Sequence, residues 1–369
     1  MQRLISAAPQ VFYRILSFLS SLSQVVAASS DFFCLSSPSL VKYSFSYSFR
    51  FFLWCNMAGM NVTYEESLKL MFFFDLKRLG AKACVEWCMK MGLIADGRKC
   101  AECGQGMNLT ERKDLGDGVN WVCRRQGHYC KVSIRANSWF ANSRMDLSTV
   151  LLATAMWVKG CTHSFIMEEA DIARQTTTDW MSFCREVCVC MLVNESVKLG
   201  GQGKIVEIDE SKFGKRKYNK GKMVEGAWVF GGVERYSNKC FMTVVQDRTS
   251  ETLLSVLKEW VIPGSTVMSD CWKSYDCLSE EGFVHLTVNH SLTFKDPDTG
   301  AHTNSIEGTW AACKRSLKGT RRVKDGMDGY LAEYIWRRCH RSGVKSTTRQ
   351  FFESIIKVYP PNKEIEKDE

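Results

Sequence analysis

Hydrophobic residues recur every three or four positions in two parts of the chain, residues 61–97 and residues 146–200. This period predicts amphipathic α-helices, because it places the apolar side chains along one helix face. In the second part we expect one helix over 147–158 and another that begins near Thr176 or Thr177. Either threonine can cap the second helix, since its hydroxyl oxygen can accept a hydrogen bond from an amide of the first turn.

From Lys204 onward the hydrophobic pattern changes to short apolar or alternating runs that polar residues and turns separate. Such runs predict β-strands, and an amphipathic run that stops at Pro263 predicts one helix. The expected strands span 204–209, 225–233, 239–245 and 265–270, and the expected helix spans 252–260. Three successive strands, a helix and a further strand predict an α/β fold, in which helices flank a mixed sheet.

The first 56 residues have a composition of their own, in which Ser and Phe dominate and Asp31 is the only acid. We assign residues 1–60 to an N-terminal extension that contributes nothing to the main fold. Two interpretations of this extension stay open. It is either a segment upstream of an alternative start at Met57, or a targeting segment.

The composition of the whole chain, 369 residues with 45% hydrophobic and 24% charged, excludes a coiled coil, a collagen-like fibre and a wholly disordered protein. The net charge of +9 favours a polyanionic partner only mildly. The 17 cysteines are odd in number and lie mostly in apolar stretches, which argues against disulfides and for the cytosol or nucleus. No uninterrupted run of 18 apolar residues occurs, so we expect no membrane-spanning helix.

Two cysteines, Cys100 and Cys103, have the spacing with which one tight turn binds a tetrahedral metal ion. Cys123 follows after 19 intervening residues, a loop length within the range of zinc ribbons. For the fourth ligand we expect Cys130, with His128 as the alternative. The competing interpretation is a small β unit whose thiols bind no metal.

The expected zinc-ribbon-like module covers residues 98–140, which are rich in Gly, Cys and polar residues. A module of this size cannot bury enough apolar surface to fold by itself, so the Zn²⁺ would be structural. Four basic residues surround the second pair of ligands, where they can contact phosphates. They are Arg124, Arg125, Lys131 and Arg135.

Three acids carry the candidate chemistry of the C-terminal half. Asp209 ends the first expected strand, Asp270 ends the fourth, and Glu307 lies at the start of a helix. Since neighbouring strands can end at the same sheet edge, these carboxylates can meet and hold two divalent cations for attack on a phosphodiester. Each acid also has a purely structural alternative: a turn at Asp209, a helix cap at Asp270, and a capping box from Asn304 to Glu307.

Two runs of basic residues follow directly after two of these acids. Lys314 and Lys318 lie seven and eleven residues after Glu307 and therefore share a helix face with it. One such run alone is usually a solvated loop, but two runs beside the same site favour contacts with DNA phosphates. The expected DNA-binding residues are Lys215, Arg216, Lys217, Lys314, Lys318, Arg321 and Arg322.

Four segments of the chain form a recognisable set. They are Val206-Glu-Ile-Asp-Glu-Ser, Ser269-Asp-Cys-Trp-Lys-Ser-Tyr, Val288-Asn-His, and His302-x-Asn304-x-Ile-Glu307-x-x-Trp310 followed by Lys314. Together they resemble the transposases of Merlin-type DNA transposons and of the related bacterial insertion sequences of the ISXO type. The resemblance covers residues 98–340, because that family also carries a zinc-ribbon-like module before its catalytic domain.

The resemblance implies an RNase H-like catalytic core with an Asp-Asp-Glu triad formed by Asp209, Asp270 and Glu307. It implies that His290 and Asn304 hold the triad side chains in position without binding the metal themselves. The implied cofactors are two Mg²⁺ ions, or Mn²⁺, on the triad and one structural Zn²⁺.

The implied domain order follows from these assignments. A helical, helix-turn-helix-like DNA-binding segment spans 146–200, the catalytic domain spans 204–342, and a C-terminal tail spans 343–369.

The implied function is that of a DDE transposase, which cuts transposon-end DNA and joins it to target DNA. The expected partners are double-stranded DNA, as terminal inverted repeats and target, and further copies of the chain in a homo-oligomeric complex, with the nucleus as the expected location. One alternative is a domesticated zinc-ribbon DNA-binding protein without transposition activity. A cysteine hydrolase that uses Cys271 with His285 or His290 is a weaker one. Glu207 is the expected uninvolved neighbour, on the face of Asp209 but away from the strand end.

Overall fold

The protein is described here by a computed structural model. It describes residues 68–125, 127–195, 197–214, 226–292, 294–317, 326–340 and 345–361. The chain divides into two compact units, Met1–Met60 and Asn61–Glu369, and the described residues belong to the second. The expected N-terminal extension lies outside the described residues, and so do Lys215, Arg216, Lys217, Lys318, Arg321 and Arg322.

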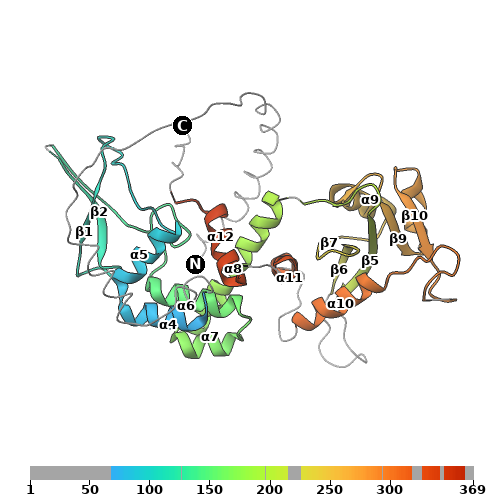
Figure 1. Ribbon diagram of the computed structural model, residues 1–369, viewed down its shortest axis with the longest axis horizontal. Coiled ribbons are helices and arrows are strands. Elements are labelled where there is room, and N and C mark those ends of the chain that lie inside the picture. The colour runs from blue at the N-terminus through green and yellow to red at the C-terminus, as the bar shows by residue number, and fades with distance from the viewer. Residues whose placement is uncertain are drawn as a thin grey trace, which may run out of the picture. The chain divides into compact units, whose positions relative to one another are not determined.

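A five-stranded mixed sheet in the order β10-β9-β5-β6-β7 organises the C-terminal half (Figure 1). Its strands are β5 Ile205–Phe213, β6 Ala227–Glu234, β7 Cys240–Val245, β9 Thr266–Asp270 and β10 Val284–Val288. β5, β6 and β7 pair antiparallel, whereas β9 pairs parallel to β5 and β10 parallel to β9. The predicted RNase H-like mixed sheet is confirmed, and β10 is a strand that the hydrophobic pattern did not predict.

Helices cover both faces of this sheet. Successive side chains of β5 point to opposite faces, so each face has apolar side chains that a helix can bury. Val206 and Ile208 pack in one hydrophobic cluster with Leu253 of α9, Ser250–Trp260. Phe213 packs in another cluster with Trp310 of α10, Asn304–Ser316, and Figure 1 shows α10 running along the sheet. The smaller elements are β4 Leu199–Gly200, which pairs with β8 Val261–Ile262, and the 3₁₀ helix η2 Lys273–Ser279.

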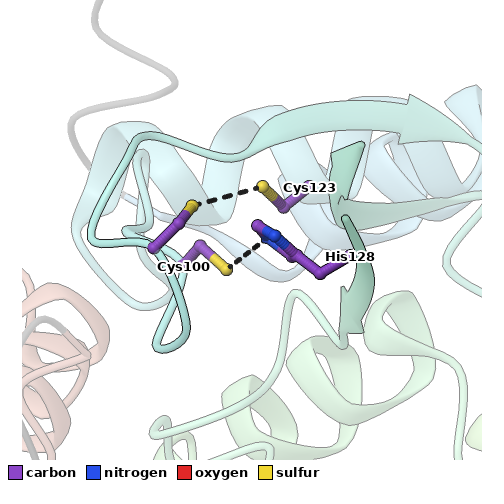
Figure 2. A group of neighbouring side chains, drawn as sticks. Cys100, Cys123 and His128 are labelled. Carbon is purple, nitrogen blue, oxygen red and sulfur yellow. Dashed lines mark hydrogen bonds between the residues drawn. The ribbon is translucent and has the colours of Figure 1, made fainter. Parts of the chain in front are cut away.

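The expected small β-rich module is present as a three-stranded antiparallel sheet. Its strands are β1 Asn108–Glu111, β2 Val119–Arg125 and β3 His128–Val132. Figure 2 shows Cys100, Cys123 and His128 pointing toward one another in this module. Trp121 and Cys123 of β2 also belong to the large helical core, so the module shares that core instead of standing apart.

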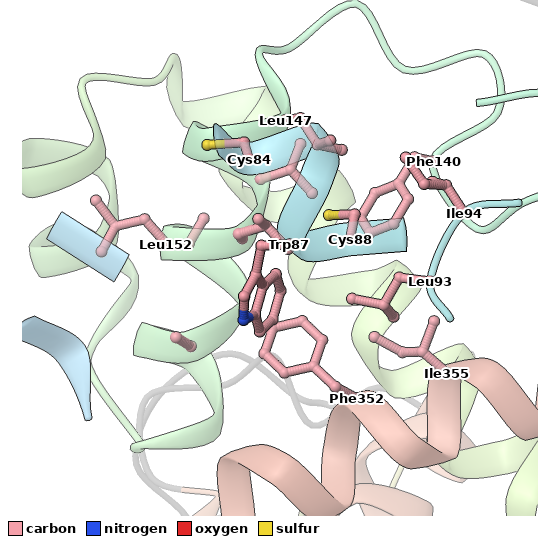
Figure 3. Close-up of a cluster of buried hydrophobic side chains, with 14 of the residues drawn as sticks. Cys84, Trp87, Cys88, Leu93, Ile94, Phe140, Leu147, Leu152, Phe352 and Ile355 are labelled. Atoms are coloured by element: carbon pink, nitrogen blue, oxygen red, sulfur yellow. The ribbon is translucent and has the colours of Figure 1, made fainter. Parts of the chain in front are cut away.

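The helices outside the sheet region share one hydrophobic core. They are α4 Leu70–Leu79, α5 Ala81–Met91, α6 Leu147–Val158, α7 His163–Ala170, α8 Arg174–Glu195 and α12 Thr347–Val358. α6 is central, since 11 of its 12 residues are buried. The indole of Trp87 in α5 meets the ring of Phe352 in α12 edge-on, with 5.6 Å between the ring centroids (Figure 3).

Two expectations for the helical parts are wrong. The segment 343–369 is no simple tail, because it contains α12, whose Phe351 and Phe352 are fully buried in the helical core. α8 begins at Arg174, ahead of the two threonines expected to cap it. Thr177 instead lies inside the helix, where its hydroxyl donates a hydrogen bond to the carbonyl of Ala173.

A three-residue turn, 171–173, joins α7 to α8. This is the connection expected of a helix-turn-helix-like unit, and Asp171 adopts the left-handed backbone conformation there with a φ of 52°. The exposed acids Glu168 and Glu169 lie just before the turn. DNA binding by this unit stays a prediction.

α11, Met327–Cys339, connects the helical core to the sheet. Leu331 packs in the cluster beneath α10, and Trp336 packs in the helical core. Arg337 donates hydrogen bonds of 2.7 Å to the carbonyls of Trp157 and Val158, which end α6 and have no partners inside that helix. Within the described ranges no helix is long and apolar enough to span a membrane, and no cysteine forms a disulfide.

Candidate active site

One face of β5 is joined to α10 by polar contacts at three successive levels. Glu207, Asp209 and Ser211 share that face, because alternate residues of a strand point the same way. Two strand residues advance about 6.6 Å and four helix residues advance about 6.0 Å, so the strand and helix stay in register across the three levels. The polar residues of this strand therefore fix the position of α10.

At the first level, the carboxylate of Glu207 caps the N-terminus of α10. Its Oε2 accepts hydrogen bonds from the backbone amides of Ser305, at 2.7 Å, and Ile306, at 3.0 Å, and its Oε1 accepts one from the Ser305 hydroxyl, at 2.8 Å. The first amides of a helix lack partners within the helix, and the helix dipole favours an anion beside them. Thr303, the N-cap residue, makes no side-chain cap bond. Glu207 supplies the cap from the strand instead.

Arg235 balances the charge of Glu207, which is fully buried. Arg235 Nε donates to Glu207 Oε1 at 2.5 Å, and Arg235 Nη2 donates to the carbonyl of His302 at 2.8 Å. Burial, and then the charge of Arg235, lower the pKa of His302, so its ring is neutral near pH 7. The expectation that Glu207 is an uninvolved neighbour is wrong, because its removal would leave Arg235 as an uncompensated buried charge.

The second and third levels are Asp209 and Ser211. Trp310 Nε1 donates to Asp209 Oδ2 at 3.0 Å, and Lys314 Nζ donates to Ser211 Oγ at 2.5 Å. Gly231 of β6 pairs with Asp209 and gives the Trp310 indole its space, since a Cβ there would lie 2.6 Å from the ring. Lys314 is the only expected DNA-binding residue within the described part of the chain, and here it contacts the strand.

Asp209 lies in the middle of β5, and the expectation that it ends the strand is wrong. The strand continues through polar residues to Phe213, because β6 pairs with it as far as Ala227. Burial, and then the charges of Asp270 and Glu307, raise the pKa of Asp209 to about 6. The structure therefore brings the three predicted catalytic carboxyl groups close enough to interact. Among the described residues, the oxygens of these three groups do not all lie within 4.8 Å of one another.

Asp270 and Glu307 are each held by local contacts. Asp270 is the last residue of β9, and its Oδ1 accepts a hydrogen bond from the amide of Trp272 at 3.2 Å. Glu307 lies in the first turn of α10, where the Thr303 hydroxyl lies 3.4 Å and His290 Nε2 lies 3.7 Å from its Oε1. His290 thus lies beside Glu307, and its supporting role stays a prediction.

Asn304, the other expected supporting residue, is the first residue of α10 and is exposed. Its side chain forms no hydrogen bond with the residues that the structure describes, and no capping box with Glu307 is formed. Its supporting role stays a prediction.

A pocket of about 410 Å³ opens beside Asp270. It is lined by Glu210 of β5, by Arg248 before α9, by residues 270–272 after β9 and by residues 288–291 after β10. Sequence reasoning missed Glu210, whose signal was only its place next to Asp209. Its Oε1 is buried without a hydrogen-bond partner among the described residues, and burial, then the charges of Asp209 and Asp270, raise its pKa to about 8.

The second candidate centre is the cysteine cluster of the β module (Figure 2). One ligand atom from each of Cys100, Cys103, Cys123 and His128 lies within 4.8 Å of all the others. His128, the alternative, takes the fourth place, and the first choice Cys130 lies outside this group. Cys130 pairs with Cys123 across the β2–β3 hairpin and shares a face with His128, so the sequence pattern alone could not separate them.

The spacing of these ligands fits a tetrahedral zinc ion. Zinc bonds of about 2.3 Å to sulfur and about 2.0 Å to nitrogen place two sulfurs about 3.8 Å apart and a sulfur and nitrogen about 3.6 Å apart. Cys103 Sγ lies 3.8 Å from Cys123 Sγ, and Cys100 Sγ lies 3.4 Å from His128 Nε2. The backbone amides of Cys103 and Glu102 lower the pKa of Cys100 to about 6, which favours the thiolate that zinc binds.

The basic residues of the module divide into two kinds. Arg135 is buried in an ion pair with Asp117 and donates to the carbonyl of Met145 at 2.7 Å, so the expectation that it contacts phosphates is wrong. Arg124 and Lys131 instead lie over the ring of Tyr129, which is 54% exposed. These two remain candidates for contacts with phosphates.

Comparison with known proteins bears on the region of the carboxylate site. A family model described as the ISXO2-like transposase domain matches residues 198–338. An uncharacterised transposase-like protein of Haemophilus influenzae is 35% identical over 109 residues, which cover 29% of this chain and 86% of that protein.

Solved structures with a similar chain path include two retroviral integrase cores. The BIV integrase catalytic core aligns over 42% of this chain and 97% of that chain, with 14% identity and a TM-score of 0.27. The HTLV-2 integrase catalytic core in complex with magnesium aligns over 41% and 97%, with 14% identity and a TM-score of 0.25.

The zinc assignment predicts one zinc ion per chain. Cys103→Ser and His128→Ala should each release the ion and unfold the β module, because a small metal module draws its folding free energy from the metal. Cys130→Ser should retain the ion. Elemental analysis of protein purified without chelator measures this. The assignment fails if wild type carries no zinc, or if Cys130→Ser loses it and His128→Ala does not.

The raised pKa of Asp209 predicts how stability depends on pH without divalent cations. Its folded pKa of about 6 exceeds the usual aspartate pKa of 3.8, so its stabilising contribution is complete below pH 3.8 and is lost as the pH rises through 6. Asp209→Asn keeps an acceptor for Trp310 and should raise the free energy of unfolding at pH 7.5 by on the order of 2 kcal/mol. This gain should shrink toward pH 4.

Thermal unfolding from pH 4 to 8, with and without Mg²⁺, measures this difference. Mg²⁺ should raise the unfolding temperature of wild type at pH 7.5 and leave that of Asp209→Asn unchanged. Equal stabilisation of both proteins by Mg²⁺ would place the cation site elsewhere.

Proposed function

This chain belongs to the ISXO2-like transposase family, and on that premise we propose that it is a DDE transposase. The proposed reaction cuts DNA at the ends of a mobile element and joins the freed 3′ hydroxyl to target DNA. The observation that carries the proposal is the position of three carboxyl groups on adjoining elements: Asp209 on β5, Asp270 at the end of β9, which pairs with β5, and Glu307 in the first turn of α10, which contacts β5. Assignment to the Merlin-type branch stays a prediction from the sequence motifs.

The donor set fits two divalent cations, Mg²⁺ or Mn²⁺. Carboxylate oxygens are the ligands these ions prefer, and the repulsion that raises the pKa of Asp209 is relieved when a cation lies among the three groups. When bound, such ions supply activation of the attacking oxygen and stabilisation of the leaving oxygen of a phosphodiester.

The residues around the triad prepare it for this role. Trp310 donates to Oδ2 of Asp209 and so fixes the orientation of that carboxylate. His290 lies beside Glu307 and also hydrogen-bonds the Thr303 hydroxyl at 2.8 Å, which connects β10 to the first turn of α10. Both residues restrict the carboxylates before a substrate arrives, and such preorganisation is what a metal-dependent site requires.

DNA recognition in this proposal comes from several parts of the chain. The zinc module offers Arg124 and Lys131 on one exposed face of its hairpin. The basic runs around 215–217 and 318–322, outside the described residues, supply further cations for phosphates. A homo-oligomer on paired element ends, within the nucleus, completes the proposal.

The test is cleavage of duplex DNA that carries the inverted repeats flanking the gene. Asp209→Asn, Asp270→Asn and Glu307→Gln should each reduce Mg²⁺-dependent cleavage by at least roughly 100-fold, since each removes the charge of a metal ligand. DNA binding in a mobility-shift assay should survive, because affinity comes mainly from lysine and arginine contacts with phosphates.

Glu251→Gln is the matched control, as Glu251 is an exposed acid in the first turn of α9. It should cleave like wild type. If all three variants cleave like the control, the triad is wrong. If wild type binds DNA specifically and never cuts it, a domesticated DNA-binding protein is the better account.

A further inference from the structure

Arg248 lies at the rim of the pocket beside Asp270, in the turn between β7 and α9. Its guanidinium carbon is 3.9 Å from the ring centroid of Trp228 and 4.7 Å from that of Trp272. The two indoles come from β6 and from the turn after β9, so three separate segments meet at this one side chain. Contact with two aromatic faces restricts the guanidinium plane and leaves its N–H edge for another partner.

The backbone around Arg248 is also fixed. The Ser274 hydroxyl of η2 donates to its carbonyl at 3.3 Å. On its N-terminal side, Asp247 accepts hydrogen bonds from the Thr249 amide at 3.0 Å and from the Thr252 hydroxyl at 2.7 Å. Thr249 in turn caps α9. Arg248 is therefore presented from a rigid turn, which lowers the entropy lost when it binds a ligand.

The charge of Arg248 has no direct counterion in the described chain, where no carboxylate oxygen lies within 4.0 Å of its guanidinium nitrogens. Glu210 lines the same pocket, and Arg248 lowers the pKa of Glu210 less than burial and the charges of Asp209 and Asp270 raise it. Arginine presents paired N–H groups that match two oxygens of a phosphate. An arginine that is held rigidly and has no ion pair among the described residues is suited to such a ligand.

The acids beside Arg248 explain why DNA needs a positively charged side chain at this pocket. Glu210 and Asp270 line the same pocket and Asp209 precedes Glu210 on β5, so the negative charges of these acids repel a phosphodiester. A fixed positive charge at the same pocket offsets this field for the strand that must approach it. Lys212 adds a second cation beside Trp228, because its Nζ lies 5.5 Å from the centroid of the Trp228 ring.

We propose that Arg248, held by Trp228 and Trp272, binds a phosphate of the DNA backbone. This phosphate is the neighbour of the phosphate that is attacked at the triad. This inference rests on the proposed function, since it assumes that DNA enters the Asp270 pocket. The alternative is that the three side chains form only a cation–π packing contact, which at an exposed site contributes about 0.5–1 kcal/mol.

Cys271 offers a native probe of this pocket, because it is exposed and lines it. Bound DNA should protect Cys271 from alkylation, measured by peptide-resolved mass spectrometry on the full chain with a 30-base-pair duplex in Ca²⁺. Exposed Cys339 in α11 serves as the internal reference. In Arg248→Ala, half-protection of Cys271 should need roughly tenfold more DNA, as expected for a lost charged hydrogen bond.

Two further variants separate charge from packing. Arg248→Lys should keep the salt dependence of DNA affinity, whereas Arg248→Ala should reduce its slope by about 0.9, the value for one phosphate contact. Lys258→Ala is the matched control at the other end of α9, where Lys258 pairs with Glu281 at 2.5 Å, and it should behave like wild type.

The outcomes distinguish the inference from the function on which it rests. If DNA protects Cys271 equally in wild type and Arg248→Ala, with equal salt slopes, Arg248 binds no phosphate and only packs. If wild type binds DNA without protecting Cys271 and does not cleave it, the proposed function itself fails. If wild type cleaves DNA but Cys271 stays reactive, the strand takes another path and the inference is overturned.

Discussion

The contact between β5 and α10 is the constraint on which the candidate active site depends. Glu207 is buried on the central strand and accepts hydrogen bonds from the first turn of α10, including the Ser305 and Ile306 amides. A buried carboxylate is stable only when its charge and its lone pairs have partners, so the strand and helix cannot slide apart without a large cost. Arg235 supplies the balancing charge from β6.

This contact determines how the triad is assembled. Asp209 lies two residues after Glu207 on the same strand face, and Glu307 lies two residues after Ser305 in the first helix turn. Capping the helix at Glu207 therefore brings the first turn of α10, which contains Glu307, to the strand that carries Asp209. The parallel pairing of β9 with β5 brings Asp270 to the same place. Burial, and then the charges of Asp270 and Glu307, raise the pKa of Asp209, and in the proposed function bound cations would relieve this repulsion.

The hydrophobic pattern predicted the mixed sheet and most of its strands, because strand periodicity is local. It misplaced Asp209 at a strand end because β5 continues through the polar residues Glu210 and Lys212, which only the pairing with β6 keeps in the sheet. It also treated Glu207 as a bystander, since its helix partner lies 98 residues further along the chain. A contact between residues so far apart in the sequence produces no hydrophobic periodicity from which it could be predicted.

The metal module shows the same limit in another form. The spacing of Cys100 and Cys103 predicted a metal knuckle, and the structure brings these ligands together with Cys123. The choice between His128 and Cys130 depended on hairpin geometry, because both side chains lie on the same face of β3. The C-terminal helix α12 was missed as a core element because its partners, Phe73 and Trp87, lie more than 250 residues earlier in the sequence.

The central claim is that Glu207 acts through α10 to position Glu307, and a double-mutant cycle on metal affinity tests it most directly. Mn²⁺ binding is measured by calorimetry in wild type, Glu207→Gln, Glu307→Gln and the double variant, below the unfolding temperature of all four. We expect Glu207→Gln to weaken binding roughly tenfold, as loss of a supporting residue does, and to have no further effect once Glu307 is replaced. Wild-type affinity in Glu207→Gln, or additive losses in the double variant, would contradict the claim.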